Sequence, residues 1–284
     1  MNTIIGIDLG ATNIKGGLVS NGRIVRSIAL PTCASKGGEI TMAVLMRVVE
    51  DLITSECEAI GLGVASVVDK KLGIAYDFTN IKGWDEVPLR DILETKFNLP
   101  VFIDNDANCF ALSERYFGEG KEIDDFVGIT LGTGVGGGII VNGELISDAH
   151  CGSGEFGMLP YKDSILEDYC ASRFFTHKYK MSGRELAERA ARNDVFAMDA
   201  FHEYGTHVGE LVKIIMYTLD PQAIILGGSI AKSFVHFEKG IRQSLTNYAY
   251  PRSIDSIILL ATKIPESGIL GAAAICMNTN HKKI

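Results

Sequence analysis

The chain carries the same structural pattern twice, and this repeat restricts the fold more than any other feature. The first copy runs from Ile4 to Val25 and the second from Phe126 to Ile146. Each copy has an apolar strand, a turn of small residues, a second strand, an Asn-Gly pair and a third strand. Asn-Gly predicts a type I′ hairpin turn, because such a turn needs positive φ at both central residues. The repeat predicts an ancient duplication in which two small-residue turns face one cleft.

Length and charge exclude several classes of protein. A chain of 284 residues is long enough for two domains, and its 46% hydrophobic and 22% charged content is ordinary for a globular protein. The net charge of −8 argues against nucleic acid as a partner, because a phosphate backbone demands a basic surface. No run of eighteen apolar residues appears, so we expect no membrane partner.

The start of the chain and its thiols predict a cytoplasmic protein. Thr3-Ile4-Ile5 opens directly into a strand pattern, without the basic and apolar regions of an export signal. Six cysteines are scattered without a CxxC pair, which is typical of reduced thiols. They are Cys33, Cys57, Cys109, Cys151, Cys170 and Cys276.

Alternating strand and helix patterns predict α/β domains with mixed sheets. Helical spacing marks the segments 39–54, 89–97, 166–179, 183–192, 195–217 and 236–248. Gly118-Glu119-Gly120 interrupts the pattern and is the predicted domain boundary. We expect a small α/β lobe at 1–118, completed by a C-terminal helix at 268–284, and a large α/β lobe at 119–267.

The turn of the first copy has residues that suit a phosphate. Asp8 ends the strand, where its carboxylate can hold a hydrated Mg²⁺. Gly10 allows close approach of the backbone, Thr12 offers a hydroxyl and an amide, and Lys15 is long enough to contact a phosphate. A plain hairpin with a solvated aspartate and a surface lysine explains the same pattern, so this turn decides nothing alone.

The turn of the second copy is richer in glycine. The segment 132–138 has five glycines in seven residues, which weakens a strand unless backbone amides must face a ligand. We expect Gly132, Thr133, Gly134 and Gly136 to form a phosphate cradle. It is neither a Walker A loop nor a dinucleotide fingerprint, because hairpins follow in place of a crossover helix.

Two further segments follow buried strands. Gly227 and Gly228 would admit a flat ring or a ribose against the backbone, although a tight strand–helix turn explains them equally well. Asp106 stands where a helix begins, so it is either a helix cap or a base that accepts the proton of an attacking sugar hydroxyl.

Other polar residues have the chemistry that binds sugars. Glu155 and Glu167 are carboxylates flanking one loop, and they can accept hydrogen bonds from paired hydroxyls. Asn80 and Asn105 supply mixed donor and acceptor groups.

Together these segments resemble the ROK family of sugar kinases, within the actin, hexokinase and Hsp70 ATPase superfamily. The matching segments are 8–15, 132–138 and 224–229, with 79–84 similar to P-N-x-x-G-W and 105–108 to N-D-A-N. The resemblance covers nearly the whole chain in the expected order. It implies a two-lobed, actin-like ATPase (ribonuclease H-like) fold with duplicated β-hairpin modules, which closes over a hexose and Mg·ATP.

The resemblance also implies roles for single residues. Asp106 becomes the catalytic base and Asn105 a sugar ligand, while Glu155 and Glu167 match the family's sugar-contacting glutamates. The implied reaction transfers the γ-phosphoryl group of ATP to a hydroxyl, most often O6, of glucose or an N-acetylhexosamine. Relatives of this kind usually assemble, so a homodimer is expected.

The chain departs from the family pattern at two places. Met158 stands where the family has a histidine that binds zinc, and the cysteine-rich CxCGxxGC segment is absent, so we expect no zinc. Ala65-Ser66 replaces Pro-Gly in a loop that lies near the sugar in relatives, which makes Ser66 a candidate sugar contact and leaves the sugar's identity open.

The sequence leaves two alternatives to a kinase. Repressors of the family carry a DNA-binding module before the first motif, and Asp8 lies only seven residues from the start, so we expect none. A sugar-sensing or regulatory protein that keeps the fold without transferring phosphate is the remaining alternative. Asp106 argues against it, because a sensor needs no base there.

Overall fold

The computed structural model describes residues 3–78 and 81–280. The chain divides into two compact units. Unit 1 comprises Met1–Lys121, Glu144–Ser153 and Ile264–Ile284, and unit 2 comprises Glu122–Gly143 and Gly154–Lys263. Residues 144–153 therefore group with the N-terminal part of the chain. The division at 118/119 expected from the sequence stays a prediction.

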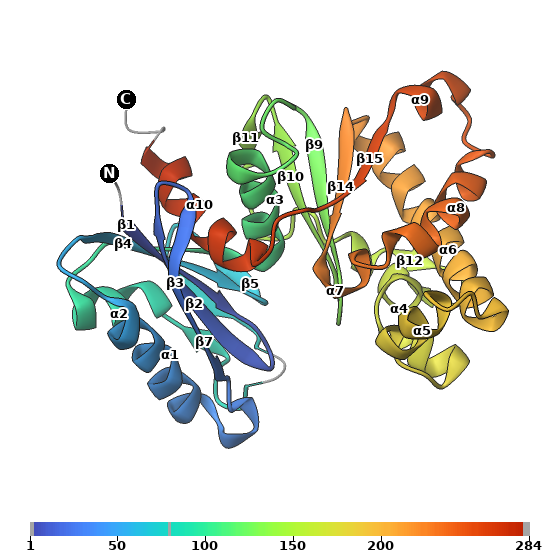
Figure 1. The fold of residues 1–284 in the computed structure, drawn as a ribbon. Helices are drawn as coiled ribbons and strands as arrows, with labels where there is room; N and C mark the ends of the chain where they lie inside the picture. The colour runs from blue at the N-terminus through green and yellow to red at the C-terminus, as the bar shows by residue number, and fades with distance from the viewer. Residues whose placement is uncertain (1–2, 79–80, 281–284) are drawn as a thin grey trace. The chain divides into compact units, whose positions relative to one another are not determined.

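Unit 1 is built on a five-stranded sheet with the order β3-β2-β1-β4-β8 (Figure 1). Its strands are β1 (Thr3–Leu9), β2 (Asn13–Ser20), β3 (Arg23–Pro31), β4 (Cys57–Val64) and β8 (Val101–Asn105). The first three strands form antiparallel hairpins, whereas β1, β4 and β8 run parallel. Since parallel strands end at one edge of a sheet, the residues that follow β1, β4 and β8 lie on the same edge.

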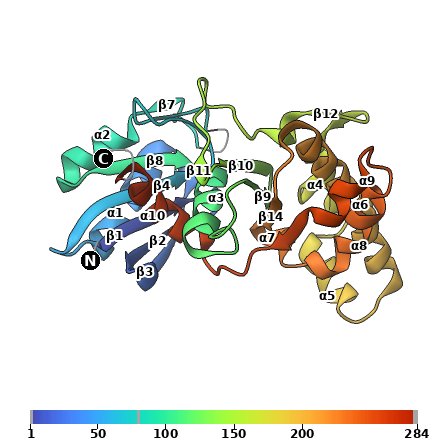
Figure 2. The same cartoon turned by 90° about the horizontal axis from the view of Figure 1, so that it is seen from above.

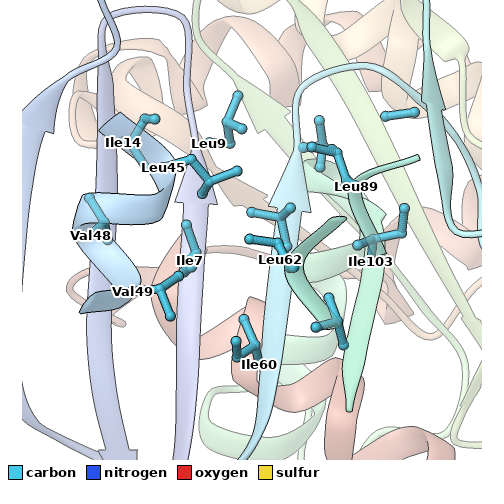
Figure 3. Close-up of a cluster of buried hydrophobic side chains, with 14 of the residues drawn as sticks. Ile7, Leu9, Ile14, Leu45, Val48, Val49, Ile60, Leu62, Leu89 and Ile103 are labelled. Atoms are coloured by element: carbon cyan, nitrogen blue, oxygen red, sulfur yellow. The ribbon is translucent and has the colours of Figure 1, made fainter. Parts of the chain in front are cut away.

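Helices cover both faces of this sheet. On one face α1 (Gly38–Leu52) and α2 (Leu89–Phe97) pack onto the strands, and their apolar side chains form one core with Ile7, Ile60 and Leu62 (Figure 3). On the other face lie α3 (Asp106–Phe117) and α10 (Ser267–Asn280). Burying each large apolar side chain of this core contributes about 1.5–3 kcal/mol.

Helix α10 approaches the sheet and α3 unusually closely. A Cβ on Gly61 of β4 would collide with the carbonyl oxygen of Ala272, and a Cβ on Gly271 would collide with that of Cys109. Glycine is therefore required on both sides of this contact. The expected closing helix thus packs directly against the sheet that begins the chain.

Smaller elements complete unit 1. A three-stranded sheet has the order β5-β6-β7. Its strands are β5 (Val67–Asp69), β6 (Ile74–Tyr76) and β7 (Glu86–Val87), and the short β11 (Glu144–Leu145) and a 3₁₀ turn (Ala34–Lys36) also belong to this unit. The sequence analysis identified none of these three short strands.

In unit 2 the strands follow the order β10-β9-β14-β15. They are β9 (Phe126–Leu131), β10 (Val135–Val141), β14 (Ala223–Gly227) and β15 (Ile258–Ala261), with the hairpin β12 (Pro160–Tyr161) and β13 (Ser164–Ile165) apart from them. The helices are α4 (Leu166–Cys170), α5 (Gly183–Ala190), α6 (Val195–Leu219), α7 (Gly228–Ala231), α8 (Phe234–Leu245) and α9 (Pro251–Ser256), with a 3₁₀ turn (Phe156–Met158) and a π-helical turn (Phe175–Tyr179). Helices α6 and α8 lie side by side in both views (Figures 1 and 2), where Gly205 and Gly240 allow their backbones to touch.

The duplication predicted from the sequence is confirmed. The order β2-β1-β4-β8 in unit 1 corresponds to β10-β9-β14-β15 in unit 2, with one antiparallel hairpin and two parallel neighbours in each. Asn21 and Asn142, each followed by glycine, have φ of 52°. The predicted α/β class with duplicated hairpin modules is therefore correct.

The helix expected over 166–179 is interrupted. Helix α4 ends at Cys170, because Ala171 adopts an extended conformation, and a π-helical turn follows. No helix within 3–78 or 81–280 has the length and apolar content needed to span a bilayer.

Candidate functional site

Three parallel strands of unit 1 bring chemically active residues to one edge. Asp8 of β1 pairs in register with Gly63 of β4, and Gly63 pairs with Asp104 of β8. Asn105 ends β8 and Asp106 begins α3. The topology therefore places both aspartates and their neighbours beyond the carboxyl ends of the strands, where ligands bind in open α/β sheets.

Asp8 is mostly buried between β2 and the start of α10. Burial raises the pKa of its carboxyl group, the nearby Lys15 ammonium lowers it, and Glu266 raises it again. Lys15 Nζ donates to Glu266 Oε2 at 2.8 Å, and both side chains are about half exposed. A Cβ on Gly268, the second residue of α10, would lie 2.5 Å from Asp8 Oδ2, so the missing side chain leaves room for this carboxylate.

The first turn holds its backbone in a tight shape. Gly10 N donates to Asn13 O at 3.1 Å, and the Thr32 hydroxyl donates to Gly10 O at 2.7 Å. Thr12 lies exposed at the tip of the turn, and its carbonyl accepts from Thr32 N. The candidate residues Asp8, Gly10, Thr12 and Lys15 thus lie together on one hairpin.

The helix cap at α3 is Asn105, and this answers the question of whether Asp106 is the cap. Asn105 Oδ1 accepts from the backbone N–H of Ala107 at 2.8 Å, as an N-cap does. Asp106 is the first residue of the helix and is half-buried. An anion at this position is stabilised by the helix dipole.

Asn105 also ties the helix to the loop that follows β4. Its Nδ2 donates to the carbonyl oxygen of Ser66 at 3.1 Å. The Ser66 hydroxyl donates to Tyr76 O, so the side chain of this candidate sugar contact is directed toward β6. Asn80, another candidate, lies outside the described residues.

In unit 2, the glycine-rich turn between β9 and β10 lies beside the end of β14. Gly227 pairs in register with Thr130, and a Cβ on Gly132 would lie 3.8 Å from the Ser229 hydroxyl. Gly228 has φ of +83°, and a Cβ there would collide with Leu131 O. The two glycine segments expected to bind nucleotide are therefore neighbours in space, although 94 residues separate them in sequence.

Two backbone donors of this turn have no acceptor in the part of the chain that the structure describes. Gly132 N donates to Gly134 O at 3.0 Å, whereas the amides of Thr133 and Gly134 have no acceptor among the described residues. Gly136 lies at the start of β10, opposite Thr130. Open amides on an exposed turn of this kind form an anion-binding concavity.

Part of the glycine content has a packing reason that the sequence could not reveal. A Cβ on Gly137 would lie 2.7 Å from the carbonyl oxygen of Gly154, so the chain beyond β11 crosses β10 at close range. Ligand binding is therefore not the only demand that this segment meets.

Glu167 contacts the glycine turn. Its Oε2 accepts from Val135 N at 3.0 Å, and its Oε1 accepts from Arg173 at 3.0 Å. Arg173 also pairs with Asp168 at 2.6 Å. Partial burial and the Glu167 carboxylate raise the pKa of Glu155, so the two candidate glutamates lie close enough to repel each other.

The segment around 158–167, at which the sequence resemblance led us to look for zinc ligands, forms a short aromatic hairpin. Tyr161 of β12 packs edge-on against Tyr169, with 5.1 Å between the ring centroids, and its hydroxyl lies 3.0 Å from His207 Nδ1. The Lys162 ammonium lies 5.1 Å from the centroid of Tyr169. Met158 is about half exposed. Among the residues that the structure describes, no three metal-binding side chains form a cluster.

A cavity elsewhere in unit 2 is separate from these turns. It has a volume of about 700 Å³, is lined by Tyr217, Tyr248 and Tyr250, and includes Asp220, which precedes β14. It lies near the start of β14, whereas Gly227 and Gly228 lie at its end.

Sequence reasoning missed four residues that hold the candidate site together: Lys70, Asp104, Arg173 and Glu266. Each is a charged side chain with an ion-pair partner: Lys70 pairs with Asp104, Arg173 with Glu167 and Asp168, and Glu266 with Lys15. The sequence marked Asp104 only by its place at the end of an apolar strand, next to Asn105.

Comparisons with known proteins agree on one family. A family model described as "ROK family" matches residues 4–279. The chain is 28% identical to a glucokinase of Thermotoga maritima, over 96% of each chain. It is also 28% identical to a xylose repressor of Bacillus spizizenii, over 95% of this chain and 76% of the repressor. A crystal structure of a ROK family glucokinase from Streptomyces griseus, in complex with glucose and AMPPNP, has 27% identity and a TM-score of 0.82, covering 96% of this chain and 98% of that one.

Proposed function

The chain belongs to the ROK family, and on that premise we propose that it is an ATP-dependent sugar kinase. It would transfer the γ-phosphoryl group of ATP to a hydroxyl, most often O6, of a hexose such as glucose or an N-acetylhexosamine. The observation that carries the proposal is the placement of Asp106. It begins α3 beyond the end of a parallel strand, while Asn105 makes the helix cap.

The nucleotide side is supported by the glycine segments of unit 2. The open amides of Thr133 and Gly134 suit phosphate oxygens, and Gly227 and Gly228, where β14 ends and α7 begins, are proposed to lie against ribose or adenine. The relative from Streptomyces griseus was crystallised with AMPPNP, an ATP analogue. Because glycine has no side chain, its backbone can come close to a ligand.

On the acceptor side, Asp106 would take the proton of the attacking hydroxyl. The oxygen of that hydroxyl forms a bond to Pγ, the bond between Pγ and the bridging oxygen breaks, and ADP leaves. Because the transition state of phosphoryl transfer is loose, positioning matters more than the strength of the base. Asn105, Glu155 and Glu167 are proposed to orient the sugar through its other hydroxyl groups.

Asp8 fits a role near Mg²⁺. Its carboxylate is a hard oxygen donor at a strand end, and Mg²⁺ is usually held by one or two carboxylates together with water and substrate phosphates. When bound, the ion would neutralise phosphate charge. Lys15 and Glu266, which neighbour Asp8, would set the electrostatic potential at this point.

The sugar is the open part of the proposal. An ADP-coupled assay with glucose, mannose, N-acetylglucosamine, N-acetylmannosamine and a β-glucoside separates the candidates. We expect one hexose to exceed the others in kcat/KM, with the phosphate on O6. If no sugar is phosphorylated while ATP still binds, the alternative of a sugar-sensing ROK protein replaces the kinase.

Substitution of the proposed base gives the sharpest test. Asp106→Asn should lower kcat by at least about 10²-fold, because general-base catalysis contributes about 10²–10⁴-fold. The dissociation constant for ATP should stay within about twofold, since Asp106 contacts no nucleotide in this proposal. The matched control is Asp91→Asn, an exposed aspartate on α2 that should keep full activity. Wild-type turnover by Asp106→Asn would exclude Asp106 as the base.

The free thiols support a cytoplasmic location for this proposed activity. All six cysteines are unpaired, and four of them are buried.

A further inference from the structure

A buried carboxylate lies directly before the residues proposed to act on the sugar. The side chain of Asp104 is only 4% exposed. Its Oδ1 accepts from Asn105 N at 2.8 Å and from Asn108 Nδ2 at 2.8 Å. Its Oδ2 lies 3.5 Å from Lys70 Nζ.

We propose that Asp104 is a positioning residue for the phosphoryl transfer, and that Lys70 helps to hold its side chain in place. This inference rests on the proposed function, because it concerns the orientation of the Asp106 and Asn105 side chains toward the substrate. Asp104 touches neither a substrate nor a phosphate in this proposal.

The geometry fixes the start of α3 from both sides of Asp106. Asp104 bonds to the residue before Asp106 and to Asn108, one residue after Ala107, while Asn105 bonds to Ala107. These three hydrogen bonds hold the first turn of the helix in one conformation. A catalytic group must be held near its productive geometry, since a displacement of about 1 Å costs about 10²-fold in rate.

Lys70 connects this helix start to the loop near the sugar. It follows Asp69, the last residue of β5, while Ser66, which directly precedes β5, accepts a hydrogen bond from Asn105 through its carbonyl oxygen. The Lys70–Asp104 ion pair and the Asn105–Ser66 hydrogen bond therefore join the same two segments. Movement of the loop would move the helix start with it.

The pocket requires a hydrogen-bond acceptor at this position. Burial raises the pKa of Asp104, while Lys70, Asn108 and the Asn105 amide lower it and Asp148 raises it. The thiol of Cys109 and that of Cys151 also face this carboxylate. A leucine of similar size would leave the Asn108 amide and the Asn105 N–H without a buried acceptor, which disfavours the observed helix start.

The experiment compares Asp104→Leu, Asp104→Asn and Lys70→Met with the wild type, using full-length protein and the best sugar. For each variant the folded fraction, kcat, the KM for sugar and the KM for ATP are measured. The control is Ser113→Ala, which removes a buried hydrogen bond to Phe110 O two turns further along α3.

We expect Asp104→Leu to lower kcat per folded molecule at least 50-fold, with the KM for ATP within twofold. Asp104→Asn keeps an Oδ1 acceptor, so it should recover kcat to within fivefold of the wild type. Lys70→Met should lower kcat about fivefold, and Ser113→Ala should lower stability without changing kcat.

Two results would overturn the proposal. One is a kcat per folded molecule for Asp104→Leu within twofold of the wild type. If Asp104→Leu does not fold, a wild-type kcat for Lys70→Met would overturn it instead. An inactive wild type, or an active Asp106→Asn, would instead overturn the proposed function, so the two failures are distinguishable.

Discussion

At the scale of single residues, the glycines of the candidate site have different physical reasons. Gly228 has φ of +83°, a conformation that an L side chain adopts only with strain, and its missing Cβ makes room for a backbone carbonyl. Gly134 has no such φ, and its missing Cβ faces the end of the Glu167 side chain at 2.6 Å. The first glycine is required by its backbone conformation and by the neighbouring carbonyl, whereas the second leaves room for a flexible carboxylate.

This difference predicts losses of stability of different size for two alanine substitutions. Gly228→Ala should lower the free energy of unfolding by about 3 kcal/mol, because backbone strain adds to a collision with a carbonyl that cannot move. Gly134→Ala should cost under about 1 kcal/mol, because the flexible Glu167 carboxylate can shift. Yet Gly134→Ala should weaken ATP binding, since the turn then loses the hydrogen bond from Val135 N to Glu167. Urea denaturation and ATP titration measure the two effects. Equal losses of stability would contradict the distinction.

At the scale of elements, the β12–β13 hairpin is held by rings and hydrogen bonds. Tyr161, Tyr169 and Phe174 surround His207, whose side chain is 4% exposed. Burial lowers the pKa of His207 to about 4, with Lys162 and Lys178 acting in the same direction and Glu203 opposing them. The folded state therefore keeps this histidine neutral.

This lowered pKa makes the free energy of unfolding depend on pH. Since the folded pKa of about 4 lies below the unfolded value of 6.5, His207 contributes stability above pH 6.5 that is lost as the pH falls toward 4. By about 1.36 kcal/mol per pKa unit, the loss is at most about 3 kcal/mol. His207→Gln should flatten the dependence of the unfolding free energy on pH between 6.5 and 4.

The matched control is His177→Gln, because His177 is exposed on the π-helical turn. This variant should keep the wild-type dependence on pH. Guanidinium denaturation at half-unit pH steps measures all three curves. An identical slope in His207→Gln and the wild type would rule out the buried neutral histidine as the cause.

The repeat and the long helices could be predicted from the sequence, but the hairpin could not. Repeated hairpins and helices such as α6 follow from local spacing and turn residues, which a single sequence displays directly. The hairpin depends on Tyr161 meeting His207, 46 residues away, and on Lys162 adopting a φ of 53°. Contacts of that range, like the Lys70–Asp104 pair, arise from tertiary packing and leave no local pattern.

Candidate site residues in contiguous motifs could likewise be predicted, whereas their tertiary contacts could not. Asp106 and Asn105 were found because their motif is contiguous, and their spatial roles follow from the strand that precedes them. The contact of Glu167 with the glycine turn was not foreseen, since its motif resembled a sugar-binding glutamate and carried no sign of Val135. The assignment of Glu167 to the sugar stays a prediction.

At the scale of the whole molecule, the two units share one topology, and we expect both to be stable without zinc. Exhaustive chelation should leave the melting temperature unchanged within about 1 °C, because ring packing and hydrogen bonds hold the hairpin in place of thiolates. Saturation with ATP and Mg²⁺ at about 100 times Kd should raise the unfolding free energy by about 2.7 kcal/mol. Calorimetry with and without chelator, together with elemental analysis, checks both. Stoichiometric zinc in the purified protein would refute the first expectation.

The docking of α10 against β1 and β4 has a consequence for how the chain is made. A ribosome releases the strands of the first sheet long before it releases Ala272 and Cys276, which cover one face of them. During that interval the exposed face, with Ile4 and Ala59, has no permanent cover. The sheet of unit 1 can therefore complete its folding only after α10 has been synthesised. Until then, a chaperone that binds apolar surface would bind this face.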